Sequence, residues 1–270
     1  MDMEKIDFLD ATNPVLHLNV HAKELGERRL VLEVKNLIHG VWSMKDPEKR
    51  VNHEKGLTNY KIPPVEDPLP GPVAVVGPTW AATVSNKILQ YDNATTAEVE
   101  PVLLIDNLGG TYVTVGSDHH DRFLERVERW KSLLYAPQIM SRDAWLYEDV
   151  KDHWDKLILR AYGYPTGGPE KYIYPKGKQV LYMQGECGQN YDAERMMKII
   201  REQTGIKDLR NSVLFLGTIP SLNGEFMWSP AWDLELEDPI LKRVLRHHYE
   251  VEVVWHRFPP ISKVEERDLV

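Results

Sequence analysis

The residues best suited to chemistry are three acids on two adjacent predicted strands. Glu98 and Glu100 lie two positions apart in a strand-like segment, and Asp118 follows on the next predicted strand. Side chains two positions apart in a strand share one face, so the two glutamates point the same way. Neighbouring carboxylates repel each other unless they share a proton or a cation. The pattern therefore indicates a site for a hard divalent cation with oxygen ligands, although a solvated acidic edge strand would also show it.

Composition excludes several classes of function. A net charge of −8 over 270 residues argues against nucleic acid or an anionic membrane as the main partner. Cys187 is the single cysteine, which excludes an intrachain disulfide and a metal site built from several cysteines. No apolar run reaches the roughly 18–20 residues of a membrane helix. The N-terminus lacks the apolar core of a signal peptide. We therefore expect a cytoplasmic protein.

The elements that must position the acids are mostly strands. Alternation and short apolar runs predict strands at 30–34, 72–77, 98–105, 111–116, 156–162, 212–216, 233–238 and 240–254. Helical patterns occur at 121–134, 143–155 and 191–204. Residues 44–70 are polar and proline-containing, so we expect a lid-like stretch with little capacity to form a core. Because the helices are few and irregularly spaced, the pattern favours an α+β, β-rich fold over a doubly wound one.

The order of the motifs resembles that of the fumarylacetoacetate hydrolase superfamily. That family has a Glu-x-Glu strand, an acid on the next strand, a Gly/Ala-Lys-Ser turn followed by proline, and a strand running into Leu-Thr-Gly-Thr-Pro. The counterparts here are Glu98–Glu100, Asp118, Lys131-Ser132 with Pro137, and Gly217–Pro220. They extend over about residues 98–255. Segments 116–122, 152–155 and 236–239 further resemble a divergent branch of the superfamily with no known function.

This resemblance implies a rolled β-sheet core. Residues 1–85 would form a small N-terminal lobe with the lid segment, and residues 86–270 the catalytic core. It also implies a homodimer and a Mg²⁺ or Mn²⁺ cofactor held by Glu98, Glu100 and Asp118. The implied substrate is a small-molecule oxo acid, with 2-oxo or 1,3-dicarbonyl groups.

The resemblance also assigns other site residues. Lys131 would hold a carboxylate or oxyanion, or donate a proton. Thr218, Lys45 and Arg122 would contact the substrate. His53 would be the counterpart of the family's catalytic histidine, which activates water from a short lid helix.

The lid motif departs from the family pattern at two positions. Lys45 stands where the family has arginine, and Gly56 stands where a glutamate follows the histidine by three residues. Glu54 is an alternative acid to orient His53. A histidine titrates near neutral pH and can serve as a base, but a solvent-exposed loop histidine is an equally good interpretation. If His53 is idle, reactions that need no activated water gain support.

The pair His119-His120 offers a replacement base beside Asp118. Neighbouring residues in a strand point to opposite faces, so at most one of the two faces the cation. A transition metal bound through one of these imidazoles is another interpretation. Asp121 and Arg122 are expected to hold Asp118 in place from behind.

We interpret the chain as a divalent-metal-dependent hydrolase that cleaves a C–C bond of an acylpyruvate-type acid. Decarboxylation, hydration and keto–enol isomerisation on the same site remain open. So does a scaffold that kept the fold and lost the chemistry.

Overall fold

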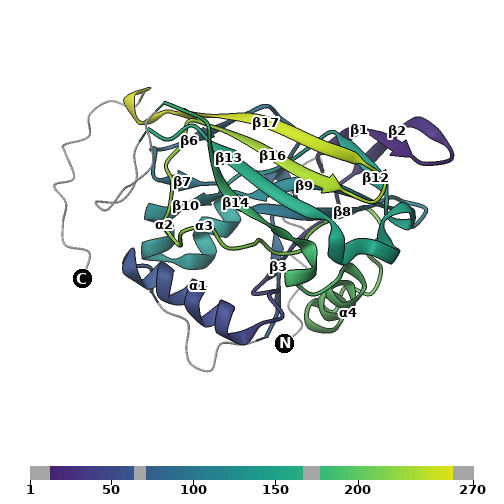
Figure 1. The fold of residues 1–270 in the computed structure, drawn as a ribbon, viewed down its shortest axis with the longest axis horizontal. Helices are drawn as coiled ribbons and strands as arrows, with labels where there is room; N and C mark the ends of the chain where they lie inside the picture. Colours follow the sequence, from purple (N-terminus) through teal and green to yellow (C-terminus); the bar gives the residue numbers. More distant parts are fainter. Residues whose placement is uncertain (1–12, 64–70, 167–176, 258–270) are drawn as a thin grey trace, which may run out of the picture.

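The computed structural model describes residues 13–63, 71–166 and 177–257. Figure 1 shows strands that curve around a common interior, with helices along one side. Within the described ranges, no helix is long and apolar enough to cross a membrane.

A mixed sheet of ten strands carries the acids. Its main path runs β2-β1-β12-β9-β8-β15-β3-β4, and β11 joins β9 to β5. The strands are β1 (Val15–Ala22), β2 (Gly26–Glu33), β3 (Asn36–Val41), β4 (Val73–Gly77), β5 (Ala82–Thr83), β8 (Val99–Ile105), β9 (Thr111–Asp118), β11 (Gln138–Met140), β12 (Asp143–Leu146) and β15 (Ser212–Phe215). Strand β8 is buried along its whole length, because both of its faces are covered.

A second mixed sheet closes the other side of the interior. Its order is β14-β13-β16-β17-β6, and only the pairing of β17 with β6 is parallel. The strands are β6 (Lys87–Gln90), β13 (Ile158–Gly163), β14 (Val180–Glu186), β16 (Ala231–Asp238) and β17 (Arg243–Val253). A short ribbon pairs β7 (Thr95–Thr96) with β10 (His120–Asp121). The expected β-rich α+β class is confirmed, with two mixed sheets.

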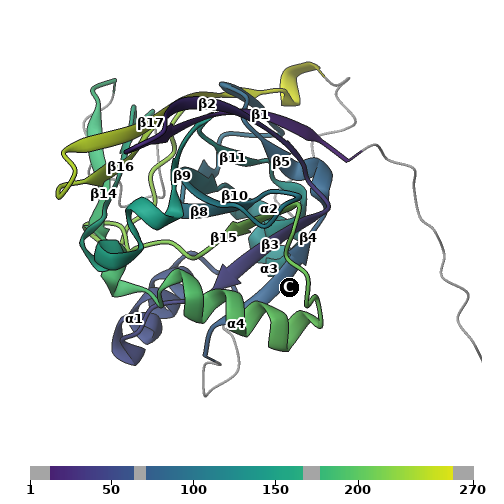
Figure 2. The same ribbon diagram turned by 90° about the vertical axis from the view of Figure 1, so that its right-hand side faces the viewer.

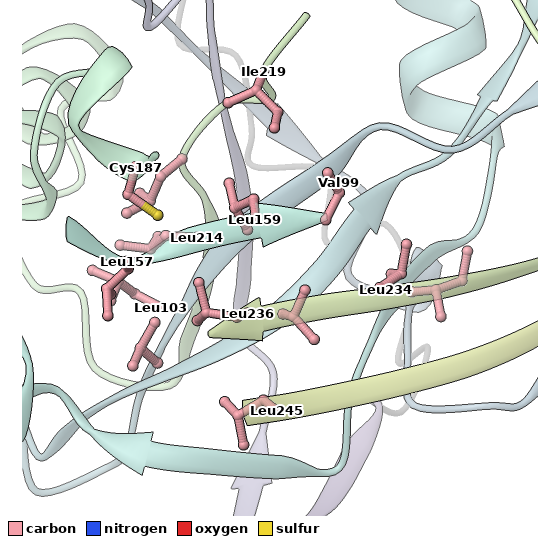
Figure 3. Packing of buried hydrophobic residues seen from close by; sticks show 14 of the residues in the cluster. Val99, Leu103, Leu157, Leu159, Cys187, Leu214, Ile219, Leu234, Leu236 and Leu245 are labelled. Atoms are coloured by element: carbon pink, nitrogen blue, oxygen red, sulfur yellow. The ribbon is translucent and has the colours of Figure 1, made fainter. Parts of the chain in front are cut away.

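The main core lies between the two sheets. Figure 3 shows leucines from both sheets packed against one another, among them Leu103 and Leu214 from the large sheet and Leu159 and Leu236 from the small one. Each is fully buried. Burying one such side chain contributes about 1.5–3 kcal/mol, so this layer holds the large sheet against the small one.

The described residues contain four α-helices: α1 (Pro47–Asn59), α2 (Arg122–Val127), α3 (Arg129–Tyr135) and α4 (Ala193–Thr204). Met196 and Ile200 of α4 belong to the main core cluster. Figure 2 shows α1 and α4 along the same edge of the molecule, below the curved large sheet. Helix α4 agrees with the prediction: the Asp192 side chain caps its start, and Gly205 ends it with a φ of 73°.

Two predicted elements differ from the structure, and residues 64–70 of the first lie outside the described residues. The polar stretch 44–70 contains helix α1, whose start is capped by Asp46 and followed by Pro47. Leu57 of α1 packs in a small apolar cluster with Phe226 and Trp228, so tertiary contacts stabilise a helix that has no strong apolar stripe of its own. The expected helix at 143–155 is strand β12 followed by two short 3₁₀ turns, at Tyr147–Asp149 and Lys151–Lys156.

The expected N-terminal lobe, residues 1–85, shares the large sheet with the expected core, residues 86–270. Strand β1 pairs in parallel with β12, and β3 pairs in parallel with β15. Strand β5 likewise pairs in parallel with β11. Strand pairings of the large sheet thus cross the proposed boundary in three places, and the division into two domains stays a prediction.

Candidate active site

The strand pairing of β8 with β9 brings the three acids together. The backbone N–H of Asp118 donates to the carbonyl of Glu98, and Val99 lies opposite Ser117 in the register. Glu98, Glu100 and Asp118 all line one small cavity of about 70 Å³. The alternation of side chains, used above to predict a shared face, therefore holds in the folded chain.

The loop after β15 holds Glu100. The backbone N–H of Gly217 donates to Glu100 Oε2 over 2.7 Å. The buried side-chain amide of Asn190 in turn donates to the carbonyls of Gly217 and Thr218, which holds this loop against the cavity. Burial, followed by the charge of Asp118, raises the pKa of the Glu100 carboxyl well above its usual range, although the bond from Gly217 opposes this.

Gly217 cannot be replaced without strain, because its φ is +101° and a Cβ would lie 1.7 Å from Ser43 Oγ. We expect Gly217→Ala to lower the free energy of unfolding by about 3 kcal/mol or more, measured by urea titration. Gly224→Ala is the matched control: its φ is +73° with no atom within 4 Å of the added Cβ, so only about 1 kcal/mol of backbone strain is expected. Equal losses in the two variants would show that the contact with Ser43 is unimportant.

Two histidines lie beside Asp118. His120 Nε2 lies 3.5 Å from Asp118 Oδ1 and 3.8 Å from Glu98 Oε2, and His39 Nδ1 lies 3.4 Å from Asp118 Oδ2. Burial opposes protonation of His120, but the charges of Glu98 and Asp118 raise its pKa to about 9. Burial alone would raise the pKa of Asp118, yet the imidazoles of His120 and His39 hold it well below its usual value. An imidazolium therefore lies between two of the three acids.

His119 points away from the cavity, as the alternation predicts for one of the pair. Its Nδ1 lies 3.0 Å from the hydroxyl of Tyr249 inside the core. Burial lowers the pKa of His119 to about 3. The structure thus brings His120, and not His119, to the acids.

Arg122 holds Glu98 rather than Asp118, so the expected partner was wrong. The guanidinium is buried and donates to Glu98 Oε1 at 2.5 Å, to Glu125 Oε2 at 2.7 Å and to Thr96 Oγ1 at 2.7 Å. Asp121 instead caps helix α2 through the N–H of Leu124. With these donors directed at protein groups, the geometry favours positioning of Glu98 over substrate contact.

Helix α1 covers the cavity, and Figure 1 shows it beside α3. His53 and Glu54 of α1 both line the cavity. Glu54 is buried and accepts hydrogen bonds from Trp42 Nε1 at 2.9 Å and from Arg129 Nη1 at 2.8 Å. It therefore fastens α1 to α3 instead of orienting His53. Within the described residues, His53 has no hydrogen-bond or ion-pair partner.

The other predicted substrate contacts divide into two groups. Thr218 lines the cavity, but its hydroxyl donates to the carbonyl of Val99 at 3.0 Å, which leaves its oxygen only as an acceptor for a ligand. Lys131 and Lys45 are exposed and lie outside the lining residues of the cavity. Lys45 Nζ lies 3.4 Å from Asp155 instead.

Sequence reasoning missed four polar residues at the cavity: Ser43, Arg50, Glu125 and Arg129. Arg50 lines it from α1; its Nη1 donates to the carbonyl of Met44, and its buried Nε has no partner among the described residues. The buried hydroxyl of Ser43 also lines the cavity and has no partner within the described ranges. For Arg50, the presence of an arginine in the polar stretch 44–70 was a weak sequence signal. For Ser43 the sequence contains no such signal, because its place at the cavity depends on the turn after β3, where Trp42 has a φ of +54°.

The oxygen donors suit a hard cation. Glu98, Glu100 and Asp118 supply carboxylates, the ligands that Mg²⁺ and Mn²⁺ prefer. Asp118 Oδ1 is buried without a hydrogen bond among the described residues. In those same residues, no three acidic, histidine or cysteine side chains are grouped as a formed metal site. The donor types fit the ion, and the ligand role of each acid stays a prediction.

The chain belongs to the family described as protein of unknown function DUF2848, whose model matches residues 42–249. No curated protein matches it. Among solved structures, Cg1458 with an inhibitor is similar at a TM-score of 0.56 and 14% identity, covering 84% of this chain and 81% of that one.

Two other solved structures show the same fold. The Escherichia coli protein 1262 has a TM-score of 0.54 and 13% identity, covering 86% of this chain and 99% of that one. A 2-keto-3-deoxy-D-arabinonate dehydratase in complex with magnesium and 2,5-dioxopentanoate has a TM-score of 0.50 and 12% identity, covering 83% and 77%. These matches confirm the resemblance to fumarylacetoacetate hydrolase-like proteins. At such identities they show the fold alone.

Proposed function

We propose that the protein is a divalent-metal-dependent enzyme acting on a small 2-oxo or 1,3-dicarbonyl acid, with hydrolysis of an acylpyruvate-type C–C bond as its reaction. The observation that carries this proposal is the single cavity lined by Glu98, Glu100 and Asp118 and covered by His53. Two buried acids and one half-buried acid are costly to keep together unless a cation offsets their repulsion.

Glu98, Glu100 and Asp118 would hold Mg²⁺ or Mn²⁺. When bound, the ion would orient the oxo acid and stabilise negative charge on its carbonyl oxygen. The magnesium complex of the similarly folded dehydratase supports this choice of cofactor. We keep the homodimer implied by the resemblance as part of the proposal, and sedimentation equilibrium tests it.

The chain's own residues would bind the acid, move the proton and exclude water. Arg50 is the cation best placed to bind the substrate carboxylate, in the role that Lys131 and Lys45 were expected to fill. His53 would accept a proton from the attacking water and return it to the carbon of the leaving group. Glu54, held by Arg129, keeps α1 over the cavity and limits access of bulk water.

A second reaction class is favoured by the surroundings of His53. Glu54, the acid expected to orient it, bonds to Trp42 and Arg129 instead. A histidine without an orienting acid is a weaker water-activating base. Decarboxylation and keto–enol isomerisation on the same three acids, which need no activated water, are therefore the alternatives.

The variant His53→Ala separates these reactions. If His53 activates water, turnover of an acylpyruvate falls about 10²–10⁴-fold, while oxalate binding in the presence of Mg²⁺ persists. His17→Ala, on the exposed face of β1, is the control and keeps full activity. Undiminished turnover in His53→Ala would reject the hydrolytic role and favour the reactions that need no activated water.

Metal binding itself is tested by thermal unfolding of chelator-treated protein. A ligand that binds only the native state stabilises it by about 2.7 kcal/mol at a hundred times its Kd. We expect the Tm to rise with Mg²⁺ or Mn²⁺ and to rise further with oxalate, which imitates an enolised oxo acid. If neither addition moves the Tm, the enzyme proposal fails and the idle scaffold becomes the better interpretation.

A further inference from the structure

A second cavity adjoins the one at the acids. The two share His53, Leu57 and Glu98 as lining residues, and the second has a volume of about 390 Å³. The cavity at the acids measures about 70 Å³. A single water needs roughly 10–15 Å³ by such a measure, so the smaller cavity has room for only a few atoms. It can hold the head of an oxo acid, and any longer substrate must extend past Glu98 into the larger cavity.

One wall of the larger cavity is a single face of α1. Lys49, His53 and Leu57 line it, and their spacing of four residues places them in one row along the helix. His53 therefore lies at the junction of the two cavities, and Leu57 gives the row an apolar end. The exposed Lys49 marks the end nearer to solvent.

Away from α1, the apolar part of the lining comes from Met183 of β14 and the loop residues Pro220, Leu222 and Phe226, beside polar residues such as Gln184, Gln189 and Ser221. The ring of Phe226 lies 4.2 Å from the Arg122 guanidinium, which covers the one buried cation on this side. That cation already donates to carboxylates and a hydroxyl of the protein. A ligand therefore meets ring and methyl surface here rather than free charge.

We propose that this larger cavity binds the non-reacting end of the substrate, and that this end is an aryl or branched alkyl group rather than a polyhydroxylated chain. The inference rests on the proposed function, because the oxo-acid head must lie at Glu98, Glu100 and Asp118. Hydroxyl groups buried against apolar walls lose hydrogen bonds to water without replacement. A cavity of about 150 Å³ holds a benzene ring, so this volume accommodates a phenyl group and its linker.

Among the polar side chains that line this cavity, Gln184 already has a hydrogen-bond partner within the protein. Its Oε1 accepts a hydrogen bond from Arg160 Nε at 2.8 Å. Glu98 is likewise paired with Arg122. These contacts remove Gln184 and Glu98 as free partners for the hydroxyls of a sugar acid, whereas Lys49, Gln189 and Ser221 also line the cavity. The apolar side chains of Met183, Leu222 and Phe226 favour 2-oxo acids substituted with an apolar group beyond the reacting carbons.

Three unreactive probes test this: oxamate, N-benzyloxamate and N-(2,3-dihydroxypropyl)oxamate. Each carries the same head, and the tails are absent, apolar and polyhydroxylated. Binding to full-length protein in Mg²⁺ is measured by isothermal titration calorimetry. From the apolar area of a phenyl ring, N-benzyloxamate should bind about 10–100-fold more tightly than oxamate. The dihydroxypropyl probe should stay within about threefold of oxamate.

The variant Leu222→Asp assigns the preference to this cavity. Leu222 is 56% exposed, so the substitution should be tolerated by the fold while placing a charge against the tail. It should lower the ratio of N-benzyloxamate to oxamate affinity at least about fivefold. Leu108→Asp is the matched control, since Leu108 is exposed in the turn between β8 and β9 and lies outside both cavities. It should leave the ratio unchanged.

The outcomes separate the two proposals. If oxamate binds and the benzyl group adds no affinity, or the polyol tail adds as much, the apolar subsite is overturned and the proposed function stands. A benzyl preference that survives Leu222→Asp would also overturn the subsite. If oxamate does not bind but a Leu222-sensitive benzyl probe does, the subsite stands and the oxo-acid function fails. Binding of none of the probes overturns both.

Discussion

Glu100→Gln abolishes metal-induced stabilisation and lowers turnover roughly a thousand-fold, as expected for loss of a ligand charge at the centre of the site. Gln has the shape of Glu and can still accept the hydrogen bond from Gly217. The fold should therefore survive without metal, because the variant also removes a carboxylate that is repelled by its neighbours. Thermal unfolding with and without Mn²⁺, beside a turnover assay, measures both effects.

The matched control is Glu33→Gln. Glu33 lies on β2, an edge strand of the large sheet, in an exposed pair with Lys35. Its loss should change neither metal binding nor turnover, since exposed pairs contribute about 0–1 kcal/mol. Full turnover by Glu100→Gln without bound metal would refute the metal-dependent mechanism.

Arg122→Met should produce the largest loss of stability. The substitution leaves the half-buried carboxylate of Glu98 and the buried one of Glu125 without their main partner and removes the cation beneath Phe226. Breaking a buried ion pair by removing one partner costs about 3–5 kcal/mol. We expect a decrease of that size in the free energy of unfolding by urea titration. The affinity for Mn²⁺ should also change, because Glu98 loses its orientation.

Arg210→Met is the matched control, because Arg210 pairs with Asp208 on the surface at 2.6 Å. An exposed pair of this kind should contribute about 0–1 kcal/mol. Removing Glu125 as well, in Arg122→Met/Glu125→Leu, should recover part of the loss, since a buried pair is often replaced by apolar groups with little cost. If Arg122→Met is no less stable than Arg210→Met, the buried network has no stabilising role.

The local sequence pattern was sufficient to predict the hairpin of β8 and β9, which carries the acids. Strand β8 is a continuous apolar run after Glu98-Val99-Glu100, and the turn at 106–110 is rich in Asn and Gly. These are short-range signals, because a strand's two-residue period and a turn's backbone requirements depend on neighbours in sequence. Helix α4 was predictable for the same reason, with Asp192 and Gly205 at its ends.

Local pattern failed where the stabilising contacts are distant. Helix α1 reads as a polar stretch, yet Glu54 is bound by Arg129 and Leu57 packs on Trp228. Strand β12 reads as a helix, yet it is hydrogen bonded to β1 and β9. In both segments the tertiary partners outweigh a weak intrinsic preference.

The sequence by itself determined that Glu98 and Glu100 share a face and that one histidine of His119-His120 must turn away. Both follow from the two-residue period of a strand. Only the tertiary structure decided which groups meet these acids: Arg50 and His53 arrive on α1, and Ser43 follows β3, which pairs with β15 across more than a hundred residues. Such contacts depend on the packing of distant elements, which no local spacing encodes.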